Sequence, residues 1–172
     1  MNELIRNYYR PIDIQRFEFI IGKIPRDVRT ILDVGAWDNL LKEMLESRGF
    51  QVVAVDLEPH HSDVLKADIT SLPFRDNSFD LVTCLEVIEH LDKEKMFIAL
   101  KELERVAKKN IIISVPNQEI PLGVGHKQFF NDKKVKNLFN CKNVEIYHFG
   151  KRLAWRGVRK YLCRIDERLL YI

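Results

Sequence analysis

Three acidic residues stand at points of this sequence where a carboxylate could bind the hydroxyl groups of a ligand. Asp33, Asp56 and Asp68 each lie at the end of a short apolar run. Asp56 follows Asp33 by 23 positions, close to the spacing of about 20 at which an acid after a second strand meets a ribose. A carboxylate can accept both ribose hydroxyl protons, and charge-assisted hydrogen bonds are the stronger kind. The spacing therefore predicts a ligand that carries a ribose.

A glycine turn follows the first of these apolar runs. Residues 30–39 read TILDVGAWDN, so a predicted buried strand passes directly into Gly35. Glycine permits a sharp backbone turn that a Cβ would obstruct. Asp38 or Asn39 can then cap a helix, whose first N–H groups are unpaired and available to a ligand. The strand, the turn and the helix start together predict a ligand site.

Two histidines are the candidates for moving a proton. His90 follows the fourth apolar run, and His126 follows a segment with two glycines. If an acceptor hydroxyl or amine must lose a proton, either imidazole can take it, and a positioned base typically contributes about 10²–10⁴-fold in rate. Either side chain can equally be structural. The His and Cys residues show no zinc-site spacing, so we expect no metal ligands.

Apolar runs and helical patterns alternate around these residues. A parallel sheet covered by helices on both faces is the arrangement that such alternation predicts. A later helix is expected to begin at Asn131 or Asp132 and to be followed by a strand at 143–149. The other strands are expected at 30–35, 51–57, 64–68, 79–85 and 110–115, and the other helices at 39–48 and 93–107.

The 172-residue chain is expected to form a single domain. Its length suits one sizeable core, and 46% hydrophobic with 31% charged residues is an ordinary composition for a soluble protein. We expect a helical N-terminal segment at 1–28, a core at 29–150 and a basic C-terminal segment at 151–172. Within the last segment, 153–162 predicts an amphipathic basic helix and 169–172 a final edge strand.

Charge is unevenly distributed along the chain. Residues 126–172 carry 12 Lys and Arg against 4 Asp and Glu, whereas the other 125 residues carry 16 against 21, so balances of +8 and −5 give the net +3. The basic third can meet RNA or another polyanion, or it can be a solvated surface. We expect a cytoplasmic protein, because the chain has neither a signal-peptide pattern nor a membrane-spanning apolar run, and its three cysteines form no CxxC.

Four stretches of the chain resemble the class I S-adenosylmethionine-dependent methyltransferases, in particular the type 11 subfamily related to ubiquinone-biosynthesis enzymes. The stretches are ILDVGAWDN, VVAVDLEP, KADITSLPFRDNSFDLVTCLEVIEHL and IIISVPN, and the resemblance runs from about Thr30 to Gly150. It implies an α/β, Rossmann-like fold with a doubly wound, mostly parallel sheet of six or seven strands flanked by helices. It also implies transfer of a methyl group from S-adenosyl-L-methionine by in-line displacement, which leaves S-adenosyl-L-homocysteine.

The resemblance implies which residues hold the amino-acid end of this cofactor. Asp33 and the backbone of Gly35 are expected to hold the methionine end. An N-terminal segment packs over the cofactor in related enzymes, so Tyr8, Tyr9 or Arg16 can contact the cofactor carboxylate. A packing helix with a snorkelling arginine is the alternative.

The resemblance also implies the contacts of the adenosine end. Asp56 is expected to take the ribose hydroxyls, and Leu57 to lie against the adenine. Asp68 accepts from the adenine amino group. Ile69 packs on the ring, while its backbone N–H reaches a ring nitrogen.

The first loop departs from the family pattern Asp-x-Gly-x-Gly-x-Gly. Gly35 is kept, Ala36 and Trp37 continue the cofactor loop, and Trp37 and Asn39 occupy the next two glycine positions. Asparagine tolerates left-handed backbone better than most residues. The indole, in contrast, stands where backbone usually approaches the cofactor. It can flank the pocket and stack on a ligand, point to solvent, or narrow the site.

The acceptor is expected at the methyl-transfer face, which the resemblance assigns to Leu85 and Glu86. We expect a small-molecule acceptor. The alternatives are a non-catalytic S-adenosylmethionine-binding or partner-dependent protein, and a methyltransferase that acts on RNA or protein. Leu85-Glu86-Val87-Ile88 replaces the Asn/Asp-Pro-Pro-aromatic stretch of enzymes that methylate a base amino group, and none of the cysteines follows a proline. The sequence does not fix the oligomeric state.

Overall fold

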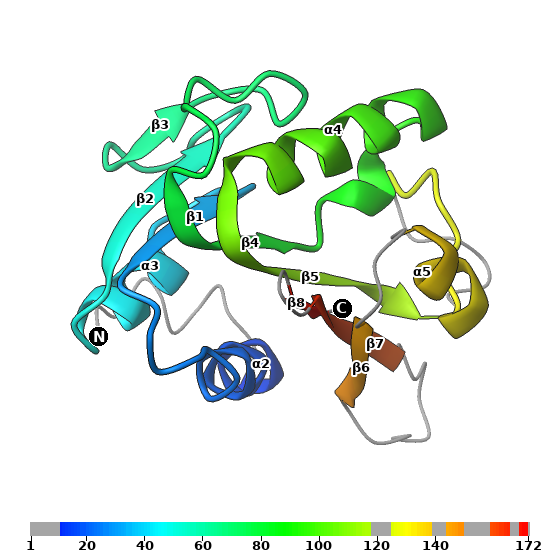
Figure 1. Cartoon of the computed structure of the whole chain (residues 1–172), viewed down its shortest axis with the longest axis horizontal. Coiled ribbons are helices and arrows are strands. Elements are labelled where there is room, and N and C mark those ends of the chain that lie inside the picture. Colours follow the sequence, from blue (N-terminus) through cyan, green and yellow to red (C-terminus); the bar gives the residue numbers. More distant parts are fainter. Residues whose placement is uncertain (1–10, 118–124, 139–143, 150–158, 166–168, 172) are drawn as a thin grey trace.

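The strands of this chain assemble into one sheet, and helices cover both of its faces (Figure 1). The computed structural model describes residues 11–117, 125–138, 144–149, 159–165 and 169–171. In chain order the elements are α2 (Pro11–Ile21), β1 (Thr30–Val34), α3 (Leu40–Glu46), β2 (Gln51–Asp56), β3 (Val64–Lys66), β4 (Phe79–Leu85), the 3₁₀ turn η1 (Ile88–His90), α4 (Lys93–Val106), β5 (Ala107–Asn117), α5 (Asp132–Leu138), β6 (Val144–Phe149), β7 (Arg159–Ile165) and β8 (Leu169–Tyr171).

The sheet is mostly parallel, as the sequence predicts for a Rossmann-like α/β fold. Its strand order is β3-β2-β1-β4-β5-β7-β6-β8. Strands β1 to β5 pair in parallel with their neighbours, whereas β7 runs antiparallel to both β5 and β6. The chain moves outward from β1 to β3 and then crosses back to β4 on the other side of β1. Ligands of such sheets bind at this reversal, beyond the carboxyl ends of the strands.

Alternate residues of the central strands face two separate hydrophobic layers. Leu32 packs in a cluster with the buried face of α4, while its neighbour Ile31 packs in a second cluster with α2 and α3. Leu81 and Val82 of β4 divide between the layers in the same way. Because both faces of the sheet are buried, its strands need apolar residues at every position. This explains the continuous apolar runs in the sequence.

The predicted helix at 153–162 is wrong for its last residues. Tyr161 and Leu162 lie in β7, where they pair with β5 on one side and β6 on the other. Backbone hydrogen bonding to two neighbouring strands outweighs a local helical pattern of apolar residues. The predicted final strand is present as β8. Residues 1–10 and 153–158, for which we also expected helix, lie outside the described residues.

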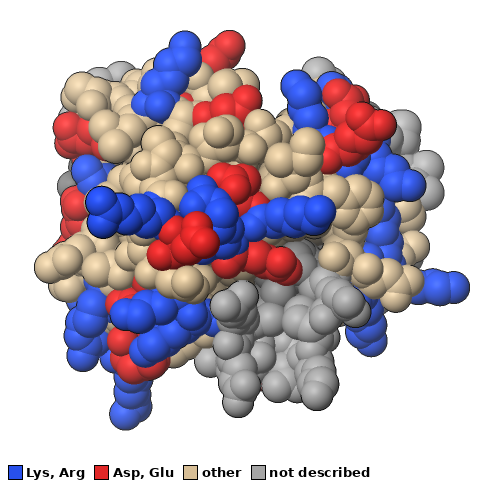
Figure 2. Space-filling view, turned by 45° about the horizontal axis from the view of Figure 1, so that its top comes forward, with Lys and Arg blue, Asp and Glu red and all other residues tan. Residues whose placement is uncertain are grey.

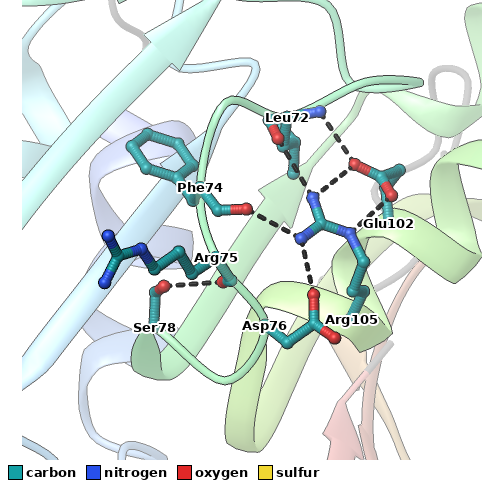
Figure 3. A network of polar contacts seen from close by, with 7 residues as sticks. All are labelled: Leu72, Phe74, Arg75, Asp76, Ser78, Glu102 and Arg105. Atoms are coloured by element: carbon teal, nitrogen blue, oxygen red, sulfur yellow. Dashed lines mark hydrogen bonds and ion pairs between the residues drawn. The ribbon is translucent and has the colours of Figure 1, made fainter.

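Arg105 of α4 fastens the loop between β3 and β4 to the body of the domain (Figure 3). Its guanidinium donates to the carbonyl oxygens of Leu72 and Phe74 at 3.0 and 2.7 Å. It also donates to both carboxylate oxygens of Glu102, at 2.7 and 2.8 Å, and to Asp76 at 2.9 Å. These charge-assisted bonds lower the pKa of Glu102 and raise that of Arg105. One side chain thus holds two loop carbonyls that would otherwise need other partners.

The surface carries charges of both signs. On the face shown in Figure 2, Lys and Arg lie interleaved with Asp and Glu rather than forming a patch of one sign. None of the described helices is long and apolar enough to cross a membrane.

Replacing Arg105 by methionine should destabilise the fold. Arg105→Met removes all five hydrogen bonds of the guanidinium, and we expect a loss of about 1–2 kcal/mol in the free energy of unfolding, because the group is partly solvated. Urea denaturation measures this change. The matched control is Arg75→Met in the same loop, whose exposed side chain points away from the network (Figure 3). Equal losses in both variants would contradict this role for Arg105.

Candidate cofactor-binding site

Two cavities meet at the carboxyl ends of β1 and β4, where the strand order reverses. The smaller has a volume of about 290 Å³ and the larger about 390 Å³. Gly35, Trp37 and Glu86 line both cavities, so these residues form a shared wall. The candidate site is therefore a two-part pocket at the position that the topology predicts.

The smaller cavity holds a buried cation from the N-terminal helix. Arg16 of α2 is only 8% exposed, and its Nη1 lies 3.4 Å from Oε1 of Glu86. Its guanidinium also lies 5.4 Å from the ring centre of Phe17. Among the described residues, neither Nε nor Nη1 of Arg16 has a hydrogen-bond partner. A buried guanidinium with unused donors is suited to an anionic ligand group.

A buried carboxyl group faces the same cavity. Asp33, at 3% exposure, accepts a hydrogen bond from the hydroxyl of Thr83 at 2.6 Å. Burial, together with the neighbouring carboxylates of Asp38 and Asp56, raises the pKa of Asp33 to about 7 against the opposing effect of the hydrogen bond from Thr83. Near neutral pH this group can therefore gain or lose its charge. A cation that enters the smaller cavity would favour the ionised form.

The larger cavity combines apolar walls with two strand-end acids. Asp56 accepts the N–H of Trp37 on Oδ2 and the N–H of Glu58 on Oδ1, both at 2.8 Å. Each oxygen of a carboxylate has a second lone pair for a ligand. Asp68 accepts the N–H and the hydroxyl of Thr70 on Oδ1, and these bonds hold its pKa below the usual value. Asp56 is thus fixed by the loops after β1 and β2, and Asp68 by its own loop.

Trp37 flanks the pocket through an unusual backbone conformation. Its φ is +51°, in the left-handed region that favours glycine. The carbonyl of Trp37 accepts the N–H of His60 at 2.7 Å, and the two rings meet edge to face with centres 5.0 Å apart. The indole is partly exposed and belongs to the wall of both cavities. The loop therefore accommodates a bulky residue by packing it against His60.

The turn after β1 lies tightly against the segment after β4. Gly35 has φ +77°, and a Cβ placed there would lie 2.2 Å from Cγ2 of Val87. The N–H groups of Gly35 and Ala36 both donate to the carbonyl of Val55, at 2.9 and 3.1 Å. Glu86, with φ +60°, accepts a hydrogen bond from the hydroxyl of Ser114 at 2.9 Å. Left-handed backbone at Trp37 and Glu86 concentrates strain in the shared wall, as is common at functional sites.

The segment that carries most of this site matches a known protein family. A family model for a methyltransferase domain matches residues 32–115, which include the carboxyl ends of β1 to β4. Over this segment the chain resembles the S-adenosylmethionine-dependent methyltransferases. The cofactor of this family is S-adenosylmethionine.

Two curated relatives illustrate the extent of the sequence match. The chain is 39% identical over 86 residues to the uncharacterized protein MJ0638 of Methanocaldococcus jannaschii, which covers 48% of this chain and 36% of that protein. It is 33% identical over 123 residues to a ubiquinone biosynthesis O-methyltransferase of Rickettsia bellii, which covers 60% of this chain and 50% of the relative. The matches thus span half or less of these relatives.

Solved structures of methyltransferases share the fold. A SAM-dependent methyltransferase from Archaeoglobus fulgidus superposes with a TM-score of 0.72 at 19% identity and covers 95% of each chain. The small RNA methyltransferase HEN1 has a TM-score of 0.70 at 21% identity. The match covers 89% of this chain and 25% of the HEN1 chain. A Burkholderia thailandensis 1,6-didemethyltoxoflavin-N1-methyltransferase with bound S-adenosylhomocysteine has a TM-score of 0.68 at 17% identity. The match covers 90% of this chain and 75% of that one. At these identities the likeness shows the fold alone.

All ten residues expected to bind the methyltransferase cofactor line one or both cavities. The sequence also pointed to Arg16, but it did not indicate Val87, Leu91 or Lys95, which line the larger cavity. These three residues follow β4 in and around η1 and α4, and nothing in their types or spacing distinguishes them from packing residues. Of the ten expected residues, those that line the smaller cavity are Asp33, Gly35, Ala36, Trp37, Leu85 and Glu86, and those that line the larger are Gly35, Trp37, Asp56, Leu57, Asp68, Ile69 and Glu86.

The fold brings the two candidate catalytic histidines together. His90 lines the larger cavity, and its ring centre lies 4.7 Å from that of His126. Nδ1 of His90 lies 3.2 Å from the carbonyl oxygen of Gly125. The pair therefore sits beside the cavity, on the side of η1.

The raised pKa of Asp33 predicts a pH dependence of stability. The unfolded chain releases this proton near the ordinary pKa of 3.8, whereas the folded chain keeps it until about pH 7. The contribution of Asp33 to stability is therefore complete below pH 4 and is lost as the pH rises through 7. Relative to Asp33→Asn, the wild type should lose about 2–4 kcal/mol of unfolding free energy between pH 4 and pH 8.

Denaturant unfolding of both proteins across this pH range measures the difference. Asparagine keeps an acceptor for Thr83 but has no proton to lose, so it is a matched reference. Parallel pH curves for the two proteins would contradict a raised pKa at Asp33.

Proposed function

We propose that this chain binds S-adenosylmethionine across the two cavities and transfers its methyl group to a small-molecule acceptor. The observation that carries the proposal is the division of the pocket into a charged part and an apolar part. The cofactor has the same division, because its methionine end carries an ammonium and a carboxylate, whereas its adenosine end is largely apolar with two ribose hydroxyls.

The smaller cavity fits the methionine end. The unpaired donors of Arg16 suit the cofactor carboxylate, and Asp33 suits the ammonium. Both contacts would be charge-assisted hydrogen bonds. Groups of opposite charge in one small cavity would also set the orientation of the bound amino-acid end.

The larger cavity fits the adenosine end. Asp56 can accept the ribose hydroxyls with the lone pairs that its backbone partners leave. Leu57 and Ile69 supply apolar contacts for the adenine, and Asp68 supplies an acceptor for its amino group. Leu57 is 58% exposed, an unusual position for a large apolar side chain and one that a bound base would cover.

The cofactor supplies an activated methyl group on its sulfonium. The chain's own residues bind, orient and exclude water, which such a displacement needs more than covalent help. Glu86 lines both cavities, is held by Ser114 and faces Arg16, and Leu85 lines the smaller cavity beside it. If the acceptor is a hydroxyl, His90 at the larger cavity is placed to take its proton.

The acceptor class rests on the curated relatives. Several are named ubiquinone biosynthesis O-methyltransferases, which supports an oxygen of a small molecule as the methyl acceptor. The interleaved charges in Figure 2 give a polyanion such as RNA no uniformly basic surface on that face. RNA and protein therefore enter the assay below as competing acceptors.

Arg16→Met should weaken the binding of ligands that carry the amino-acid end of the cofactor and leave the binding of other ligands unchanged. By calorimetry we expect S-adenosylhomocysteine to bind this variant at least tenfold more weakly, about 1.4 kcal/mol, because its carboxylate loses a partner. 5′-Methylthioadenosine, which lacks the amino-acid end, should bind both proteins equally. Arg26→Met, at an exposed arginine outside the pocket, is the matched control. Equal weakening of both ligands would contradict the assignment of Arg16 to the carboxylate.

Methyl transfer can be followed with cofactor labelled on its methyl group. We expect label in the small-molecule fraction of a cell extract and much less after Asp56→Asn, because this substitution weakens the ribose contact. The RNA and protein fractions are assayed in parallel. Label only in one of those fractions would overturn the small-molecule acceptor. Binding of S-adenosylhomocysteine without label in any fraction would favour the non-catalytic alternative.

A further inference from the structure

We propose that Glu89, His90 and His126 bind a divalent transition-metal ion beside the larger cavity. One potential ligand atom from each of the three side chains lies within 4.8 Å of the other two. Ligand atoms about 2.1 Å from a tetrahedral ion lie about 3.4 Å apart. Rotation of the two imidazole side chains can shorten the distances between ligand atoms to this value, because His90 is exposed and His126 is partly exposed.

Backbone hydrogen bonds hold the segment with His126 against η1. The N–H groups of Lys127 and Gln128 both donate to the carbonyl of Glu89, at 2.7 and 3.1 Å. The side chain of Gln128 donates to the carbonyl of Leu91 at 3.2 Å. The fold therefore brings together ligands that lie 36 positions apart in the sequence, which is why their spacing did not suggest a metal site.

The ring of His90 is oriented as a ligand histidine usually is. Its Nδ1 lies 3.2 Å from the carbonyl oxygen of Gly125. A neutral imidazole that donates its proton there carries its lone pair on Nε2, and metal-binding histidines commonly donate the other ring N–H to a backbone carbonyl. Gly125 has φ +79°, and even a Cβ at this position would lie 3.4 Å from Nδ1. A larger residue would crowd this orienting contact.

The donor set indicates which ions would bind. Two imidazoles and one carboxylate suit zinc, manganese, iron or cobalt in the divalent state, whereas magnesium prefers oxygen ligands. Glu89 is completely buried, so its carboxylate is fixed in place and screened from water. Three protein ligands leave a coordination position open, as in catalytic rather than structural zinc sites.

The location connects the ion to the proposed reaction. Because His90 lines the larger cavity, an ion on its ring would lie at the edge of that cavity. A hydroxyl of the acceptor that occupied the open position would be oriented and would lose its proton to solvent more easily. With the ion bound, His90 would be a ligand and would no longer act as the base. This role rests on the proposed function, whereas binding of the metal does not.

Calorimetric titration of the metal-free full chain with Zn²⁺ tests the site. We expect one Zn²⁺ per chain and an affinity at least tenfold lower in His126→Ala, which removes a ligand at a partly exposed position. His61→Ala is the matched control, because its exposed ring accepts the N–H of Asp63 and lies outside the cluster. Co²⁺ should give visible absorption bands with the wild type and His61→Ala but not with His126→Ala.

S-Adenosylhomocysteine binding is measured on each variant as a check of folding. No Zn²⁺ binding to a wild type that binds S-adenosylhomocysteine would overturn the metal site alone. Equal loss of Zn²⁺ affinity in His61→Ala and His126→Ala would also overturn it. Zn²⁺ binding by a wild type that does not bind S-adenosylhomocysteine would instead overturn the proposed cofactor site.

Discussion

The close approach of the β1 turn to the segment after β4 is the constraint on which the site depends. Gly35 lies so near Val87 that only a residue without a Cβ fits there. This contact joins the ends of two neighbouring parallel strands, so the loops beyond them must diverge around it. The smaller cavity forms on the side of α2 and α3, and the larger on the side of β2, β3 and η1. The pocket lies beside this contact between the Gly35 turn and the Val87 side chain, at the point where the strand order reverses.

The cavity-lining residues that the sequence predicted share a simple property. Asp33, Asp56, Asp68 and Glu86 all stand at or just after the ends of parallel strands, and such ends meet at one edge of a sheet. Buried strands have continuous apolar sequences, so the residue that follows each strand can be predicted from the sequence. The site was predictable to the extent that it consists of strand ends.

Other features depend on tertiary contacts that no local pattern encodes. Arg16 could be named as a candidate, but its burial against Glu86 depends on where α2 packs. Tyr161 and Leu162, for which we predicted helix, lie in a strand because β7 pairs with β5 on one side and with β6 on the other. The meeting of His90 and His126 depends on hydrogen bonds between a loop and the carbonyl of Glu89. Nothing in the spacing of these residues records such contacts.

The two-part pocket has a consequence for turnover. Every contact that we assign to the cofactor involves its amino-acid end or its adenosine, and these are unchanged when the methyl group leaves. The spent cofactor keeps those contacts and loses only the positive charge of the sulfonium. The proposed site would therefore bind S-adenosylhomocysteine nearly as well as the cofactor, so we expect accumulated product to slow turnover until a downstream reaction consumes it.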